Sequence, residues 1–189
     1  YVDAVKVWHK AWDIEDPVFL QSYSVSASTS VPLGIRFSPD GTKMFLTSGT
    51  YSNLQEYTLS TAWDTSTISY TREVDITTTG NYSVYDVAWN SAGTKFYVPS
   101  IESGFATVNS IDTWTVTTPF TLLGATKSIT DNLSSVHGSI LGIDFSPDGT
   151  KLYIGDYSPG TRGFCEYTLS TPFLISSRTY IAYVSITLT

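Results

Sequence analysis

The chain has 189 residues, of which 54 are serine or threonine, and a net charge of −7. Its ten lysines and arginines are scattered, which disfavours a surface that follows nucleic-acid phosphates. No apolar run approaches the roughly 20 residues of a membrane-spanning helix, whereas an apolar fraction of 41% is ample for a packed core.

A ten-residue segment recurs along the chain. Residues 34–43 read Gly-Ile-Arg-Phe-Ser-Pro-Asp-Gly-Thr-Lys, 142–151 repeat this sequence with one change, and 86–95 form a degraded copy. A second block, Glu-Tyr-Thr-Leu-Ser-Thr, stands at 56–61 and again at 166–171. Self-similarity at an interval of about fifty residues is the signature of a repeat architecture.

Each repeat is predicted to form four short strands. In the first repeat, apolar and polar residues alternate at 34–38, and the Pro-Asp-Gly-Thr sequence that follows favours a tight turn. Further strands are predicted over 43–48, 55–59 and 69–76, and the fourth strand of the middle repeat over 121–129. Helical periodicity is absent, and β-branched and aromatic residues dominate these segments.

Four-stranded units of this length, joined head to tail, are typical blades of a β-propeller. The predicted fold is therefore all-β, a propeller-type array of about three and a half antiparallel blades. The half blade spans 1–30, and the full blades span 31–77, 83–130 and 138–189. Both ends supply the same half of a blade, which leaves three explanations open: a segment of a longer repeat protein, an N-terminal pair that docks elsewhere, or a ring shared by several chains.

The Phe-Ser-Pro-Asp-Gly-Thr-Lys sequence resembles the TolB-type and YVTN-type propeller repeats. The Glu-Tyr-Thr-Leu-Ser-Thr-Ala-Trp-Asp block at 56–64 is similar to a narrower subset, found in structural proteins of marine phages and in surface or secreted proteins of marine microbes. This resemblance covers nearly the whole chain and implies the propeller architecture. It assigns no catalytic, cofactor-binding or metal-binding residue, because the motif residues build turns and cores.

Few side chains point to catalysis or metal binding. The two histidines, His9 and His137, are interpreted as ordinary strand or loop residues, since a zinc site needs several His or Cys ligands at short spacing. The single cysteine, Cys165, lies in a predicted strand and is interpreted as a buried, inert thiol. A cleft in which His137 meets a carboxylate and a nucleophile would change this interpretation. No cofactor and no metal are expected.

Charged residues give two further candidates. Three clustered carboxylates have the oxygen ligands that Ca²⁺ prefers, but they lack a glycine-punctuated loop and are interpreted as a solvated connection. They are Asp13, Glu15 and Asp16. Arg36 and Asp144 occupy equivalent positions on first strands, which line a propeller axis, so they are candidates for a polar ligand or for an ion pair. Asp40 and Asp148 are interpreted as turn formers.

Aromatic residues recur once in each repeat, as packing between blades requires. They are Trp12, Trp63, Trp114 and Phe173. A platform that stacks a sugar would instead use exposed aromatic residues in loops. The candidates for that role are Tyr51, Tyr82 and Tyr157.

The sequence favours a non-enzymatic protein. The leading prediction is a structural or adhesive virion component, such as a phage tail, fibre or capsid-decoration subunit, on the virion or outside the cell. It would bind other copies of itself or other virion or surface proteins through packed faces and the uncharged edge strand at 180–188. The alternative is a secreted or cell-surface module that binds a glycan or protein, and a hydrolase is the third hypothesis. No nucleic-acid partner and no membrane span are expected.

Overall fold

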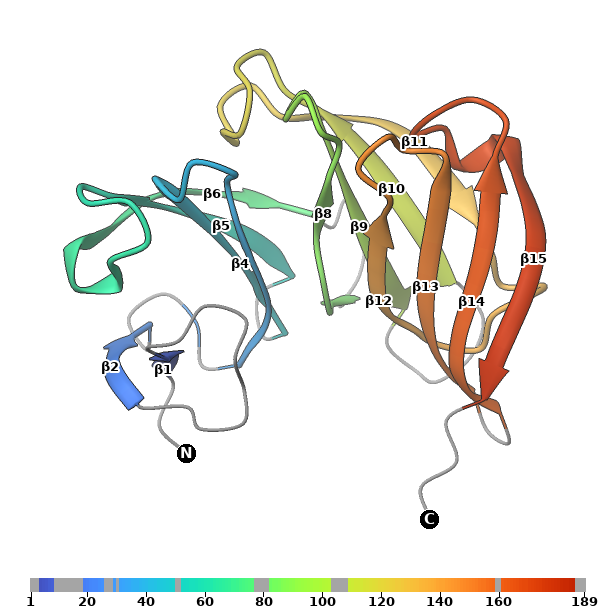
Figure 1. The fold of residues 1–189 in the computed structure, drawn as a ribbon, viewed down its shortest axis with the longest axis horizontal. Coiled ribbons are helices and arrows are strands. Elements are labelled where there is room, and N and C mark those ends of the chain that lie inside the picture. Colours follow the sequence, from blue (N-terminus) through green and yellow to red (C-terminus); the bar gives the residue numbers. More distant parts are fainter. Residues whose placement is uncertain are drawn as a thin grey trace.

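The computed structural model describes residues 4–8, 19–25, 29, 31–49, 52–76, 82–102, 109–158 and 161–185. In these ranges the fold is all-β, as predicted: three antiparallel sheets follow one another, and a two-stranded sheet lies beside the first (Figure 1). We call the three larger sheets the first, second and third blades. No helix in the described ranges has the length and apolar character needed to cross a bilayer.

Each sheet is built from strands that are consecutive in the sequence. The two-stranded sheet contains β1 (Ala4–Trp8) and β2 (Phe19–Ser24). The first blade contains β3 (Pro32–Phe37), β4 (Lys43–Ser48), β5 (Asn53–Leu59) and β6 (Ile68–Asp75). The second contains β7 (Tyr82–Val84), β8 (Ala88–Trp89), β9 (Lys95–Glu102), β10 (Asn109–Thr115) and β11 (Thr126–Asn132). The third contains β12 (Ile140–Phe145), β13 (Lys151–Ser158), β14 (Thr161–Leu169) and β15 (Arg178–Ser185). Single 3₁₀ turns, η1 (Thr65–Thr67) and η2 (Ile175–Ser177), precede β6 and β15.

The aspartates of the Pro-Asp-Gly-Thr turns hold these turns together, as predicted. Asp40 Oδ1 accepts hydrogen bonds from Ser38 Oγ at 2.6 Å and from Thr42 N at 3.1 Å. Asp148 makes the equivalent bonds at 2.6 and 3.0 Å, and these bonds, the one from the Ser146 hydroxyl foremost, lower its pKa to about 2. The repeated motif therefore specifies a turn, and its carboxylates accept hydrogen bonds within that turn.

The recurring aromatic residues do not share one position. Trp63 covers the first turn, where a Cβ at Gly41 would lie 2.3 Å from its ring, and Trp63 is 56% exposed. Phe120 covers the second turn in the same way and Phe173 the third. Trp114 is instead a buried strand residue on β10. The prediction of a core aromatic is thus wrong for Trp63 and right for Trp114, and their equal spacing does not reflect equivalent positions.

Aromatic side chains fill the junction between the first two blades. Phe96 on β9 is fully buried and stacks on Trp114, with ring centroids 5.7 Å apart and 6° between the planes. Trp89 contacts both Phe96 and Phe45 of the first blade, at centroid distances of 5.2 and 4.7 Å. Each junction thus has its own apolar cluster, one shared by the first and second blades and one by the second and third, because a blade buries its faces against its neighbours.

Polar contacts at the junctions differ from one junction to the next. Gln21 on β2 donates to Asp64 Oδ1 and Thr65 Oγ1 of the first blade, at 3.1 and 2.9 Å. Tyr97 of the second blade donates to the carbonyl of Phe173 in the third, at 2.7 Å. These contacts satisfy polar groups that would otherwise lose their hydrogen bonds on burial.

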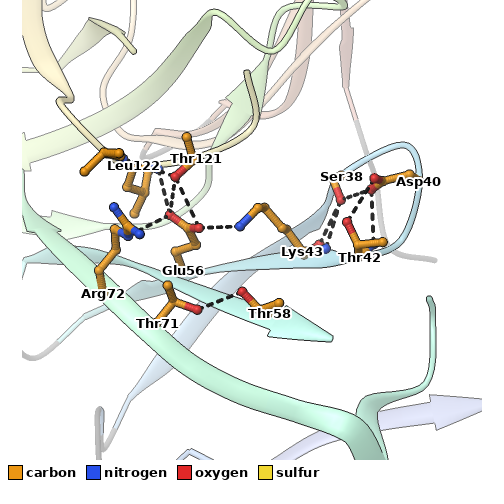
Figure 2. A network of polar contacts seen from close by, with 11 residues as sticks. Ser38, Asp40, Thr42, Lys43, Glu56, Thr58, Thr71, Arg72, Thr121 and Leu122 are labelled. Atoms are coloured by element: carbon orange, nitrogen blue, oxygen red, sulfur yellow. Dashed lines mark hydrogen bonds and ion pairs between the residues drawn. The ribbon is translucent and has the colours of Figure 1, made fainter. Parts of the chain in front are cut away.

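The junction between the first and second blades contains a buried carboxylate, Glu56, whose side chain has no exposed surface (Figure 2). Its Oε2 accepts hydrogen bonds from Leu122 N at 2.7 Å and from Thr121 Oγ1 at 3.0 Å. Lys43 Nζ lies 2.7 Å from Oε1, and Arg72 Nε lies 3.4 Å from Oε2. Two cations on the first blade and two donors from the second therefore compensate the buried charge.

The first strand of the first blade approaches the connection between β7 and β8 closely at Gly34. A Cβ there would lie 2.7 Å from both Asp86 Cα and Tyr85 O, which are backbone atoms and cannot rotate away. We expect Gly34→Ala to lower the free energy of unfolding by about 1–3 kcal/mol because these segments must separate. Gly142→Ala is the matched control, since its Cβ would meet only Asp86 Oδ2 at 3.8 Å. Urea unfolding of both variants tests this, and equal losses would contradict it.

Candidate functional site

His137 lies in the connection between β11 and β12, and its side chain is fully buried. Its Nδ1 lies 2.9 Å from Asp156 Oδ2, and its Nε2 lies 2.8 Å from Tyr167 Oη. The imidazole thus joins a carboxylate on β13 to a phenol on β14. The sequence had suggested an ordinary histidine, whereas the structure brings this histidine together with a carboxylate and a hydroxyl.

Strand register in the third blade produces this meeting. Ile140 on β12 pairs with Asp156 on β13, and Tyr157 N donates to Ser139 O at 2.8 Å just beyond that pair. His137 N donates to Leu133 O at 2.9 Å, which fixes the turn before β12. Asp156 carried no sequence signal, because only the register of this hairpin reveals its proximity to a histidine 19 residues away.

Asp156 and Tyr167 also line a cavity of 480 Å³, within the range of about 300–1,000 Å³ typical of small-molecule sites. The other lining residues are Val136, Cys165, Arg178, Tyr180 and Tyr183. The wall therefore combines three tyrosines with the Asp156 carboxylate and the Arg178 guanidinium, whose Nη1 lies 3.7 Å from Asp131 Oδ1. This combination suits a polar ligand that has a ring, since aromatic faces pack against rings.

The hydrogen bond between His137 and Tyr167 can run in either direction, according to whether the imidazole is neutral or protonated. Burial is the main cause that raises the pKa of Tyr167 to about 12, so the phenol keeps its proton at neutral pH. With a neutral imidazole, Tyr167 donates to His137 Nε2, and Nδ1–H donates to Asp156. With an imidazolium, Nε2–H donates to Tyr167 Oη and frees the phenolic proton for another acceptor. One proton on His137 thus decides whether Tyr167 can accept or deliver a proton.

The first blade holds a neutral contact at the equivalent place. Gly49 N donates to Val31 O there, as Tyr157 N does to Ser139 O in the third blade, which makes Thr29 and Ser48 the counterparts of His137 and Asp156. Their hydroxyl oxygens lie 2.7 Å apart. A hydrogen bond at this place therefore connects the strands without any ionisable group, and the His–Asp–Tyr relay adds a chemistry that the fold does not require.

A second polar cluster joins the first strands of all three blades. Arg36 on β3 donates from Nε to Val87 O at 2.8 Å and from Nη2 to Ile143 O at 3.1 Å. Its Nη2 lies 3.4 Å from Asp86 Oδ2 and 4.0 Å from Asp144 Oδ1. The predicted pair is thus brought together, with Asp86 as a member that sequence analysis missed. Burial raises the pKa of Asp86, and the guanidinium opposes that shift. Because Arg36 is bonded to two carbonyls, we interpret this cluster as a clamp between blades.

The other residues singled out in the sequence show less evidence of a functional site. Cys165 is buried, as predicted, and burial raises the pKa of its thiol. Tyr157 is 49% exposed, but the guanidinium of Arg162 lies 4.7 Å from its ring centroid and donates to its hydroxyl. In the described ranges no group of three or more His, Cys, Asp or Glu side chains is arranged to hold a metal ion. The following lie outside the described residues: His9, Trp12, Asp13, Glu15, Asp16, Tyr51, the side chain of Tyr82 and the end of the edge strand at 186–188.

Comparison with known proteins identifies the fold only. No family model and no curated protein matches the sequence. Among solved structures, the chain is similar to a "putative 6-phosphogluconolactonase" from Bacteroides uniformis, at 15% identity and a TM-score of 0.58, over 84% of this chain and 42% of that one. It is similar to a protein from Lactobacillus plantarum at 17% identity and a TM-score of 0.61, over 97% and 50%. A "putative 6-phosphogluconolactonase" from Bacteroides fragilis matches at 12% identity and a TM-score of 0.56, over 82% and 39%. The chain spans about half the length of these proteins or less.

These neighbours run against the prediction of a structural or adhesive virion component. Two of the three carry the name of an enzyme, and none is named as a virion or adhesion protein. The narrower resemblance to phage repeats gains no support from them. The wider resemblance holds: the chain has a propeller-type fold built from four-stranded antiparallel blades.

Proposed function

We propose that this chain hydrolyses a small lactone or ester in the cavity beside Tyr167. The observation that carries the proposal is the buried Asp156–His137–Tyr167 relay, which reaches the wall of a 480 Å³ cavity. The two named neighbours suggest the substrate class, since their names specify a phosphorylated sugar lactone. A guanidinium in the wall is the group that such an anionic substrate needs.

The relay can serve both steps of the reaction. Water attacks the lactone carbonyl, Tyr167 takes the proton of the water, and the phenolic proton passes to His137 Nε2. Asp156 stabilises the imidazolium, as the carboxylate does in serine hydrolases. The ring C–O bond then breaks, and the same proton returns through Tyr167 to the leaving oxygen, which gives a hydroxy acid. His137 is fully buried, so Tyr167, which lines the cavity, and not His137, meets the substrate.

Arg178 and Cys165 both line the cavity but differ in what they contribute to the reaction. Arg178 stabilises the negative charge that develops on the carbonyl oxygen or binds the phosphate of the substrate. Cys165 is not the nucleophile, because burial raises the pKa of its thiol and keeps it protonated at neutral pH.

Tyr167→Phe tests the proposal. We expect wild-type protein to hydrolyse 6-phosphogluconolactone or gluconolactone faster than buffer does, and Tyr167→Phe to lower kcat/KM by roughly 10²–10⁴-fold because the proton path is broken. Tyr57→Phe is the matched control: Tyr57 is the buried counterpart in the first blade and bonds Gln55 at 2.8 Å, away from the cavity. Its kcat/KM should equal that of wild type.

Lactone loss is measured by continuous titration of the acid that forms, with the spontaneous rate subtracted. A wild-type rate no higher than that of buffer overturns the proposal. So does a Tyr167→Phe variant that folds and keeps full activity, because the relay would then act only as a structural hydrogen-bond network.

A further inference from the structure

The cavity wall at Tyr167 has a counterpart in the first blade. The repeated Glu-Tyr-Thr-Leu block places Tyr57 where the third blade has Tyr167. In the first blade, Tyr57 contacts Tyr70 edge-to-face, with ring centroids 5.7 Å apart. In the third blade, Tyr167 contacts Tyr180 edge-to-face at the same distance. Because both blades build this wall in the same way, the side chains that face it can be compared position by position.

The strand that precedes each blade supplies one of these facing side chains. After both strands a backbone N–H donates to the carbonyl four residues earlier at 2.9 Å, from Thr29 before the first blade and from His137 before the third. Six positions before these two residues stand Tyr23 on β2 and Asp131 on β11. We call the contact between the two-stranded sheet and the first blade the N-terminal junction. It has a tyrosine where the junction between the second and third blades has an aspartate.

Tyr23 fills the N-terminal junction. Its ring meets Tyr57 edge-to-face, with centroids 6.5 Å apart and 79° between the planes, and it packs on the apolar cluster that contains Ile68. Asp131 has no ring, and its carboxylate lies 3.7 Å from Arg178, the counterpart of Ile68. The counterparts of Tyr57 and Ile68 both line the 480 Å³ cavity. The cavity therefore borders the place into which the Tyr23 ring would project.

A second replacement enlarges the same space. Gln55 is fully buried in the first blade and accepts a hydrogen bond from Tyr57 Oη at 2.8 Å. The third blade has Cys165 at this position, and its shorter side chain lines the cavity. Shortening buried side chains leaves space that a ligand of the lost shape can occupy. Two side chains that fill the N-terminal junction are thus replaced by smaller ones around the cavity.

We propose that the cavity binds an aromatic ring of the size of a phenol, in the place that the Tyr23 ring takes in the N-terminal junction. Aromatic rings favour edge-to-face contacts, and three tyrosines line the cavity. A space of about 150 Å³ is enough for benzene, so 480 Å³ also leaves room for an ester or lactone group beside the ring. The inference rests on the site of the proposed function and narrows its substrates to aromatic esters and lactones.

Binding of p-cresol, which is the tyrosine side chain as a free molecule, tests the ring site. In calorimetric titration, wild type should bind it with a dissociation constant of about 1 mM or lower. Asp131→Tyr should raise that constant by roughly 30-fold or more, because the new ring fills the cavity from within. Asp131→Asn is the matched control: it has nearly the same size, leaves the cavity open and should keep the wild-type constant. A wild type without saturable binding overturns the proposal, as does a folded Asp131→Tyr variant that binds like wild type.

Nuclear Overhauser effects locate the ligand in the wild-type protein, so the test does not depend on the folding of Asp131→Tyr. Val136 lines the cavity and has two methyl groups. In methyl-labelled protein, these groups should show effects to the ring protons of p-cresol. Effects that reach only methyl groups away from the cavity would contradict the assignment.

Hydrolysis then separates this inference from the proposed function. Dihydrocoumarin, a lactone fused to a benzene ring, should have a kcat/KM roughly 10-fold or more above that of gluconolactone, because only the former places an aromatic ring in the cavity. Equal values, or hydrolysis of gluconolactone by a protein that does not bind p-cresol, would overturn the aromatic site and leave the hydrolase standing. Binding of p-cresol in the cavity without hydrolysis of either lactone would support the aromatic site and overturn the hydrolase.

Discussion

Glu56→Ala is expected to lower the free energy of unfolding by about 3–5 kcal/mol, because it removes one partner of a buried ion network. The loss leaves Lys43 and Arg72 without their carboxylate, and it leaves the amide of Leu122 and the hydroxyl of Thr121 without their acceptor. Guanidinium unfolding followed by circular dichroism measures the change. An unaltered m-value would show that the folded and unfolded states expose the same surface as before.

Glu166→Ala is the control for this prediction. Glu166 has the equivalent strand register and an equivalent lysine partner, Lys151, but its side chain is 25% exposed. Ion pairs of this kind contribute little, so the loss should be a small fraction of that for Glu56→Ala. Both variants are measured at the same protein concentration. Similar losses would mean that the contact with the second blade does not stabilise the fold.

Phe96→Ala should also lower the free energy of unfolding by about 3–5 kcal/mol, because it removes buried apolar surface and leaves a cavity. Phe96 is fully buried between the first two blades, and its ring contacts both Trp114 and Trp89. Because the cavity opens at a junction, the variant should also alter the near-ultraviolet circular dichroism of the two tryptophans. Thermal and denaturant unfolding give the size of the effect.

Phe164→Ala makes the same chemical change at a partly exposed position on β14 of the third blade. Phe164 is 39% exposed, so the alanine variant should lose well under half of what Phe96→Ala loses. The decisive quantity is the ratio of the two losses in free energy of unfolding, Phe164→Ala to Phe96→Ala. A ratio near one would show that another part of the protein covers Phe164 in solution under the conditions of the measurement.

The repeated motif predicted the architecture well because its residues have strong local preferences. Proline, aspartate and glycine specify the turn, and alternation on either side specifies the strands. Local preference failed where a distant group intervened. A strand was expected over 121–129, yet β11 begins at Thr126, since Thr121 and Leu122 bind Glu56 of another blade. No local signal in the sequence reveals that contact.

The candidate site was harder to predict than the fold. Arg36 and Asp144 were recognisable because repeat alignment places them at one position, and the structure brings them within 4.0 Å. The sequence does not reveal the partners of His137, because Asp156 and Tyr167 join it through strand register and not through a motif. Equivalent positions in the first blade carry Thr29 and Ser48, so comparison of the repeats would have marked this place as unusual only once the register was known.

The unlike polar contacts at successive junctions have a consequence for assembly of the chain. Similar repeats can dock in the wrong order during folding, and such misassembly is a common failure of repeat proteins. Here Gln21 matches Asp64 and Thr65, whereas Glu56 matches Thr121 and Leu122. If Glu56 met the wrong neighbour, a carboxylate would face Leu174 and Ile175, the residues that follow Phe173 at the third turn. The sequence differences between the repeats therefore favour one order of blade docking over the alternatives.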